Sequence, residues 1–280
     1  MRRASWGAAP GLVVITVISG GAMVTVTLAS LGLVPLFGPP QATLTAWQVH
    51  GEDLVRGVGE SLRIALPATA LAVTVGSGLA GLLLRPDRLA GIVRIGCLVV
   101  LLLPHIVAAS SMLMLLGDGG LLSRVAVALD VGWPALVAGP VPVATVLALA
   151  WKESAFVALV LAGALAPGHR TRMAVAAGLG AGPWQRWRRV TLPTAAPALL
   201  ATGLVTLVYA IGSYEAAWLL SAAVPEPLPV LSARLLQSID LLARPAAAAA
   251  ALTASLLAVC VTLPALVALP RLRRLTPGSA

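Results

Sequence analysis

The chain has 280 residues and a mean hydropathy of +0.97, and 59 % of its residues are hydrophobic while only 10 % are charged. An average soluble domain carries about 25 % charged residues, so this composition excludes a soluble globular enzyme. Its only lysine, Lys152, lies outside any Gly-x-x-x-x-Gly-Lys-Ser/Thr pattern, which excludes ATP binding by a P-loop. The cysteines form no C-x-x-C pattern and the histidines lack metal-ligand spacing. We therefore expect no catalytic, cofactor-binding or metal site.

Apolar stretches divide the chain into segments long enough to cross a bilayer, which takes about 20 helical residues each. In chain order, the expected spans are 12–36, 64–84, 95–116, 141–165, 195–220 and 246–269. The first is longer than the apolar region of a signal peptide, so we expect it to be retained. The predicted fold is an all-α membrane protein, a polytopic bundle of six transmembrane helices forming one domain over residues 1–280.

The positions of the charges predict the orientation of this bundle. If both termini are cytoplasmic, the inner segments hold 13 of the 19 basic residues and the outer segments hold five. The inner set is Arg2, Arg3, Arg85, Arg88, Arg94, Arg170, Arg172, Arg186, Arg188, Arg189, Arg271, Arg273 and Arg274. The positive-inside rule favours this orientation. The net charge of +9 is therefore a topology signal and does not indicate a nucleic-acid partner.

The inner loop between the fourth and fifth spans, residues 169–193, is longer than the others. Its first half, residues 173–181, is expected to form about two turns of helix that end at a cluster of glycines and Pro183. Beyond the break, Trp184 and Trp187 share one helix face and are flanked by arginines, a composition typical of the headgroup layer of a membrane. Pro193 is then placed to open the fifth span, because the first turn of a helix needs no backbone N–H. An ordinary surface-lying connector would have the same features.

The same loop resembles the signature loop of permease subunits in binding-protein-dependent ABC importers. That family's pattern is Glu-Ala-Ala-x-x-x-Gly, nine further residues and then Ile-x-Leu-Pro. Here nine residues separate Gly180 from Val190-Thr-Leu-Pro193, while Ala174 stands where the family has Glu. Other segments, including those around Trp151 and Tyr214, resemble permeases of the polyamine, thiamine, ferric-iron and sulfate branch. The likeness covers roughly residues 61–270.

The resemblance implies a non-catalytic subunit that forms a solute path, in a bacterial inner membrane, and couples it to ATP hydrolysis on a separate subunit. The implied partners are cytoplasmic ABC ATPases, a second permease subunit (identical or homologous), an extracytoplasmic solute-binding protein and the lipid bilayer. In the family this loop is a coupling helix that docks on the ATPase. The positions of this chain that correspond to the coupling motif are Ala174, Ala176, Leu179, Gly180, Ala181, Val190, Leu192 and Pro193.

Ionisable residues inside the predicted spans are a second candidate site. A charge at mid-helix costs about 2.5–3.5 kcal/mol on insertion scales, so such residues should face protein or water. We expect Lys152 or Glu153 to face the fifth span, with a Lys152–Glu215 ion pair. The candidate translocation path comprises Lys152, Glu153, Ser213, Tyr214 and Glu215. A salt bridge that only stabilises the bundle explains the same charges.

Two other function classes have to be weighed against an ABC permease. His105, Glu153 and Glu215 could serve a secondary transporter driven by an ion gradient, although such a carrier would not need the 169–193 loop. An intramembrane serine hydrolase would pair His105 with Ser77 or Ser110, but neither serine lies in a Gly-x-Ser-x-Gly pattern. The sequence fixes neither the solute nor the identity of a second permease.

Overall fold

The computed structural model describes residues 9–275, and the side chains of residues 10–264 and 267. Within this range the chain forms helices and connecting loops, with no β-strand, which confirms the expected all-α class. Six of the helical segments are long and apolar enough to cross a membrane. Of the basic residues used to predict the orientation, Arg2 and Arg3 and the side chains of Arg271, Arg273 and Arg274 lie outside what the structure describes.

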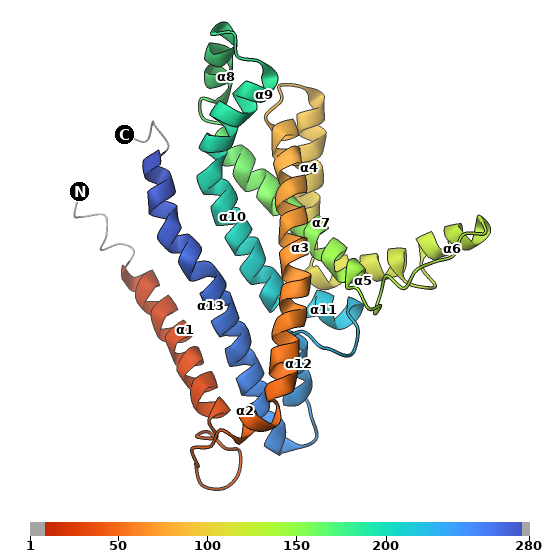
Figure 1. The fold of residues 1–280 in the computed structure, drawn as a ribbon, viewed down its shortest axis with the longest axis vertical. Coiled ribbons are helices and arrows are strands. Elements are labelled where there is room, and N and C mark those ends of the chain that lie inside the picture. Colours follow the sequence, from red (N-terminus) through yellow and green to blue (C-terminus); the bar gives the residue numbers. More distant parts are fainter. Residues whose placement is uncertain (1–8, 276–280) are drawn as a thin grey trace. The chain divides into compact units, whose positions relative to one another are not determined.

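The chain packs as two compact units, whose helices are labelled in Figure 1. The first comprises residues 1–60 and 225–257, and the second comprises residues 61–224 and 258–280. Two long helices contribute to both units: α3 (Gly51–Leu83) and α13 (Arg244–Leu275). We describe each unit separately.

The first unit contains α1 (Ala9–Ser30), α2 (Thr45–Val49), α12 (Leu228–Leu236) and the 3-10 turn η3 (Leu241–Ala243), with the adjoining parts of α3 and α13. Its core is built where leucines of α12, such as the fully buried Leu228, pack on small residues of α13, such as Ala250. A close approach between α3 and α12 depends on Gly57, where a Cβ atom would lie 2.9 Å from Leu228 Cδ2.

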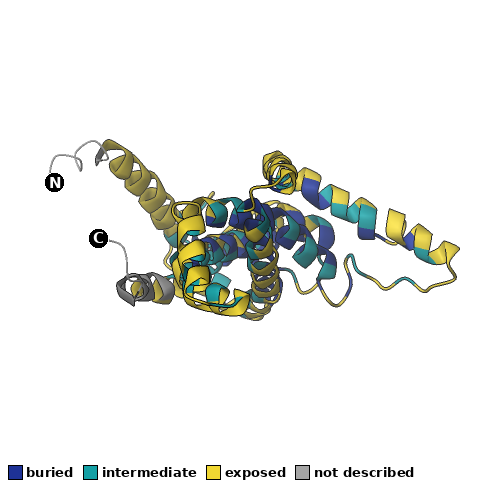
Figure 2. Cartoon of the chain, turned by 90° about the horizontal axis from the view of Figure 1, so that it is seen from above, coloured by how far each residue is buried: buried dark blue, intermediate teal, exposed yellow. Residues whose placement is uncertain are grey.

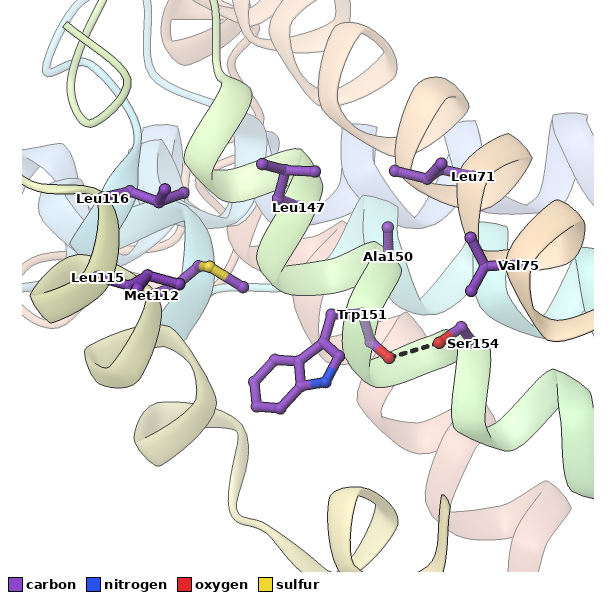
Figure 3. Close-up of a pocket in the computed structure, with 9 residues that line it drawn as sticks. All are labelled: Leu71, Val75, Met112, Leu115, Leu116, Leu147, Ala150, Trp151 and Ser154. Carbon is purple, nitrogen blue, oxygen red and sulfur yellow. Dashed lines mark hydrogen bonds between the residues drawn. The ribbon is translucent and has the colours of Figure 1, made fainter. Parts of the chain in front are cut away.

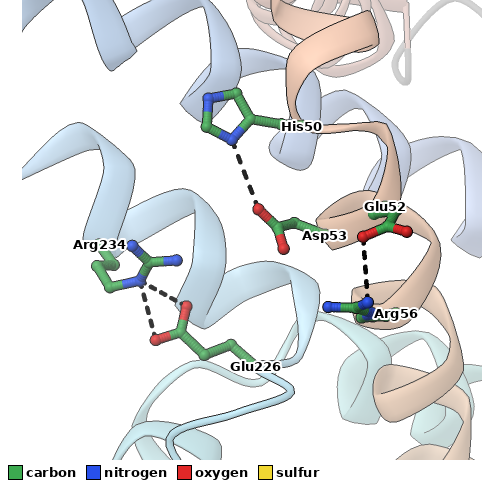
Figure 4. A network of polar contacts seen from close by, with 6 residues as sticks. All are labelled: His50, Glu52, Asp53, Arg56, Glu226 and Arg234. Atoms are coloured by element: carbon green, nitrogen blue, oxygen red, sulfur yellow. Dashed lines mark hydrogen bonds and ion pairs between the residues drawn. The ribbon is translucent and has the colours of Figure 1, made fainter.

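Three ion pairs lie in the described part of the first unit (Figure 4). Arg234 Nε donates to both carboxylate oxygens of Glu226, at 2.9 and 2.7 Å, and the Glu226 side chain is only 14 % exposed. Along the start of α3, Glu52 and Arg56 pair at 3.1 Å and His50 Nδ1 lies 3.6 Å from Asp53. The Glu226–Arg234 pair is a bifurcated bond from one N–H, and because it is the shortest and the most buried of the three pairs, it is the strongest.

The second unit is organised around one central helix, α7 (Val143–Leu165). Helices α4 (Arg88–Leu102), α5 (His105–Leu116), α10 (Leu192–Gly212) and α11 (Glu215–Leu220) all pack against it. More than half of the most apolar 18-residue window of α7 is buried, a larger share than in any other candidate span among the described residues. Most residues of α7 are buried or half-buried. Figure 2 colours the described residues by how far each is buried.

Small residues allow α7 to approach its neighbours closely. A Cβ atom at Gly76 of α3 would lie 2.7 Å from Val157 Cβ and 2.8 Å from the Ser154 carbonyl oxygen, so only glycine fits there. On an adjacent face of α7, Ala155 and Ala158 form a buried cluster with Cys97 of α4 and Leu83 of α3. This packing is typical of membrane helices, where association depends on close van der Waals contact.

Two of the predicted spans are each divided into two helices in the structure. The predicted helix 95–116 is instead α4 and α5, separated at Leu103 and Pro104, and the candidate span of this region is His105–Ala128, which includes α6 (Leu121–Ala128). Pro104 holds Leu103 in an extended conformation, with ψ of 131°, because the residue before a proline disfavours the helical region. The predicted helix 195–220 ends early at Gly212, and α11 begins at Glu215.

Candidate functional site

The 169–193 segment folds as a helix, a turn and a second helix, as the sequence predicts. Helix α8 (His169–Gly178) ends in a turn in which Ala181 N–H donates to Ala176 O and Gly180 N–H donates to Ala177 O. This pair of bonds is a Schellman motif, and it places Gly180 in the left-handed region with φ of +81°. The turn therefore requires glycine at position 180.

The chain re-enters the bundle through α9 (Pro183–Arg186) and a π-helical stretch, η2 (Trp187–Thr191), that continues into α10. In η2, Leu192 N–H donates to Trp187 O, five residues back. Pro193 has no N–H to offer the carbonyl four residues before it, so the regular α-helical ladder cannot close there. The wider π turn is the local result, and the sequence analysis did not anticipate it.

The predicted motif residues lie along this segment and most of them are accessible. Leu179 is 82 % exposed at the tip of the turn, and Ala174 and Gly180 are also exposed. Val190 and Leu192 lie where η2 joins α10, with Pro193 in the first turn of α10. Thr191 Oγ1 contacts Met173 Sδ at 3.7 Å, which ties the start of α10 back to α8. An exposed leucine beside a fixed turn is an arrangement that a partner protein can bind.

Aromatic and basic side chains occupy the other half of the segment. Trp184 and Trp187 stack with ring centroids 4.9 Å apart and planes 18° apart, as their spacing predicts. At the start of α8, burial and the nearby Arg172 guanidinium lower the pKa of His169, so its imidazole is neutral near pH 7.

A second group of polar residues surrounds the two helix breaks of the second unit, and we call it the break cluster. Its members are His105, Lys152, Glu153, Tyr209, Ser213 and Glu215. They come from the N-terminus of α5, the middle of α7 and the ends of α10 and α11 that flank the second break. The sequence analysis placed all of these except Tyr209 among its candidate or alternative residues.

Lys152 is buried and binds the end of a helix. Its Nζ donates to the carbonyl oxygen of Leu103 at 2.7 Å and lies 3.4 Å from those of Val100 and Leu101, while the residue is 4 % exposed. These carbonyls end α4 and carry the negative end of its dipole, so an ammonium group there satisfies acceptors that the break leaves free. The expected Lys152–Glu215 ion pair is not formed among the described residues, because Lys152 is directed toward α4 instead.

Glu153, His105 and Tyr209 form the centre of the break cluster. His105 Nε2 lies 3.8 Å from Glu153 Oε1, and the His105 ring contacts the Tyr209 ring with centroids 4.8 Å apart. Glu153 is 9 % exposed, and it acts electrostatically on Tyr209 of α10. Of the two residues expected to face the fifth span, Glu153 is the one that acts on a residue of α10, while its ion-pair partner is His105 of α5.

The three polar residues at the second break differ in how far they are exposed. Ser213 is 5 % exposed and lies beside Tyr209, Tyr214 is half-buried, and Glu215 is exposed at the first turn of α11. The Tyr214 ring stacks on Trp218 with centroids 6.1 Å apart. Glu215 also lies close enough to His105 to act on it electrostatically. Of the five predicted path residues, Glu215 is therefore the carboxylate that this chain leaves accessible.

The opposite face of α7 borders an apolar cavity of about 390 Å³ between α3, α5 and α7 (Figure 3). Leu71, Met112 and Trp151 are among its lining side chains, and its one polar side chain, Ser154, donates to the Trp151 carbonyl oxygen at 2.7 Å. Such a lining offers a polar solute nothing to bind, so the break cluster, and not this cavity, is the candidate path.

The serine hydrolase alternative has no geometric support. Ser77 Oγ donates to Val73 O at 2.6 Å and Ser110 Oγ donates to Ile106 O at 2.8 Å, each within its own helix. His105 faces Glu153 and Tyr209 instead.

The chain was compared with known protein sequences, structures and families, and solved structures with a similar fold exist. No curated protein sequence matches the chain. A bacterial ABC transporter involved in the import of the acidic polysaccharide alginate is similar in structure, with a TM-score of 0.70 at 16 % sequence identity over 94 % of this chain and 93 % of that one. A bacterial alginate ABC transporter in complex with an alginate pentasaccharide-bound periplasmic protein is similar too, with a TM-score of 0.71 at 17 % identity over 94 % and 92 % of the two chains.

A family model matches residues 72–274, which include the 169–193 segment and the break cluster. Because this family consists of ABC importer subunits, the match argues against the alternative of a carrier driven by an ion gradient. The chain is an import permease of the multi-pass membrane type, and it belongs to the family of binding-protein-dependent transport system inner membrane components.

Proposed function

We propose that the 169–193 segment is the coupling element of this permease and that a separate cytoplasmic ABC ATPase binds it. The observation that carries the proposal is Leu179, which is 82 % exposed beside a turn fixed by Gly180. A large apolar side chain held in one position on a rigid turn is suited to a pocket on a partner. The small residues Ala174 and Ala176 of α8 let such a partner approach the helix backbone.

The coupling role is tested by replacing the exposed leucine with a charge. We expect Leu179→Asp to abolish co-purification of the ATPase in mild detergent while leaving the melting temperature of the permease within about 2 °C of wild type. Leu242→Asp is the matched control, because Leu242 is 87 % exposed in the first unit, outside the coupling segment. If Leu179→Asp retains the ATPase as well as Leu242→Asp does, the proposed docking site is wrong.

The solute path runs, in this proposal, past the break cluster, and Glu215 and Tyr214 contact the solute. Glu215 is exposed in the single chain, whereas Ser213 and Glu153 are buried. Glu215→Gln should then lower ATP-dependent uptake at least tenfold with normal expression and melting. An uptake rate unchanged by Glu215→Gln would remove Glu215 from the path.

We infer the other subunits of the transporter from the family to which the chain belongs. A second permease copy or homologue completes the path, an extracytoplasmic solute-binding protein delivers the solute, and ATP hydrolysis takes place on the ATPase, so the chain itself is not an enzyme. Both termini are cytoplasmic in this arrangement, residues 1–280 act as one permease domain, and the membrane is a bacterial inner membrane. The sequence segments near Trp151 and Tyr214 support the proposal that this permease belongs to the polyamine, thiamine, ferric-iron and sulfate branch of the family.

A further inference from the structure

A second cavity, of about 260 Å³, lies at the end of the second unit that carries the 169–193 segment. Its walls are the last turns of α3 and α7 and the first turns of α10, and they are mostly aliphatic, as in Leu161, Leu165 and Leu199. Its remaining lining includes the His169 side chain of α8 and Trp187 and Thr191 of η2. The cavity therefore joins an apolar interior to a polar and aromatic segment at the level where three spans end.

The residues around this cavity carry an unbalanced positive charge. Residues 169–193 include five arginines and no aspartate or glutamate. None of the five forms an ion pair with any side chain that the structure describes. Arg172 is the arginine that the structure places beside His169, on which it acts electrostatically. Since His169 is neutral near pH 7, Arg172 supplies the positive charge next to this lining residue.

We propose that this cavity binds one acyl chain of an anionic glycerophospholipid, with the headgroup phosphate held at Arg172. An apolar crevice between membrane helices next to unpaired arginines has the complementarity that such a lipid requires. The stacked Trp184 and Trp187 belong at the level of the glycerol and headgroup, where indole rings concentrate. A zwitterionic lipid satisfies the apolar part of the site but not its charge.

The chain contains a matched pair of glycines that tests the cavity. Gly81 lines it and Gly78 does not, although both are exposed positions of α3 where an added Cβ atom would meet nothing within 4 Å. Gly81→Leu should therefore fill the cavity without a clash at the backbone, and Gly78→Leu should change only the outer surface of the same helix.

The probe is a phosphatidylglycerol with a photoreactive diazirine on one acyl chain, added in trace amounts to the purified full-length permease in detergent. We expect it to label the 187–199 segment, which neither glycine variant alters. Unlabelled phosphatidylglycerol should compete at a concentration at least tenfold lower than unlabelled phosphatidylcholine. Gly81→Leu should lower the labelling at least fivefold, and Gly78→Leu should leave it within twofold of wild type.

The charge is tested separately by Arg172→Gln, with Arg170→Gln as the control on the same helix. Arg172→Gln should reduce the preference for phosphatidylglycerol over phosphatidylcholine to about threefold or less, and Arg170→Gln should preserve it. Equal competition by the two lipids in the wild-type protein, which needs no variant, would overturn the proposal. Labelling that is unaffected by Gly81→Leu would overturn it as well.

Discussion

Lys152 should hold the broken α4–α5 helix in place, and its replacement by methionine tests this directly. Methionine has a similar length but donates no hydrogen bond, so Lys152→Met leaves the Leu103 carbonyl oxygen without the donor now 2.7 Å away. A hydrogen bond from a charged donor contributes about 1.5–3 kcal/mol, and a buried acceptor left without a partner costs about 1–3 kcal/mol. The two contacts at 3.4 Å are too long to add much. We expect the packing of α4 on α7 to weaken by about 2 kcal/mol.

The chain contains a reporter for this effect in Cys97, which is 5 % exposed where α4 packs on α7. The assay measures the rate at which a maleimide dye labels Cys97 in a Cys260→Ser background, which removes the exposed second thiol. If labelling requires local opening of α4, a loss of about 2 kcal/mol raises the rate about thirtyfold, because 1.4 kcal/mol corresponds to a factor of ten.

Two control variants distinguish the loss of the hydrogen bond from Lys152 to the end of α4 from other effects of substitution. Lys152→Arg keeps a cationic donor and should raise the Cys97 labelling rate by much less than Lys152→Met does. Glu215→Gln changes an exposed carboxylate and should leave the rate within about twofold of wild type. The reasoning is refuted if Lys152→Met labels Cys97 no faster than wild type, or if Lys152→Arg and Lys152→Met accelerate it equally.

Two further substitutions have expected outcomes that a melting experiment can check. Gly76→Ala should destabilise the permease by about 1–3 kcal/mol because its methyl group overpacks the α3–α7 contact, whereas Gly78→Ala should be neutral or stabilising because its methyl group meets only open space. Glu226→Gln should cost about 1 kcal/mol because it removes the charge and one of the two oxygens that accept from Arg234 Nε, and Glu52→Gln should cost less than about 0.5 kcal/mol because its side chain is 84 % exposed. A Gly78→Ala variant as unstable as Gly76→Ala, or a larger effect at Glu52 than at Glu226, would contradict these assignments.

Local signals made the 169–193 segment predictable. The end of α8, the glycine turn, the Trp184–Trp187 stack and the start of the next span near Pro193 all follow from residues a few positions apart. Glycine, proline and aromatic spacing determine such features without help from the rest of the fold. The π-helical stretch was missed because it depends on how Pro193 affects the turn before it, and hydrophobic periodicity contains no trace of that effect.

The helix breaks were harder to predict because their stabilising partners are distant in the sequence. Pro104 lies within the predicted span 95–116, but a proline is often accommodated within a membrane helix. What stabilises a full break here is Lys152, 49 residues from the carbonyl that it binds. The expected Lys152–Glu215 pair was wrong for a related reason. A single sequence places each residue along its helix but does not fix the rotation of one helix against another.

The proposed coupling segment and the break cluster lie at opposite ends of one helix, α10. Helix α10 begins at Leu192, in the proposed coupling segment, and ends at Gly212, beside the break cluster. Its 21 residues span about 30 Å at 1.5 Å per residue, which is the thickness of a bilayer core. The chain departs from regular α-helix at both ends, through η2 at one and the Ser213–Tyr214 break at the other. A hydrogen-bonded helix is stiff along its axis and irregular backbone is not, so a pull on the coupling segment should move α10 as a rod. That movement would shift the Ser213 end of α10 along α7, on which α10 packs, and so change the position of Ser213 relative to Glu153.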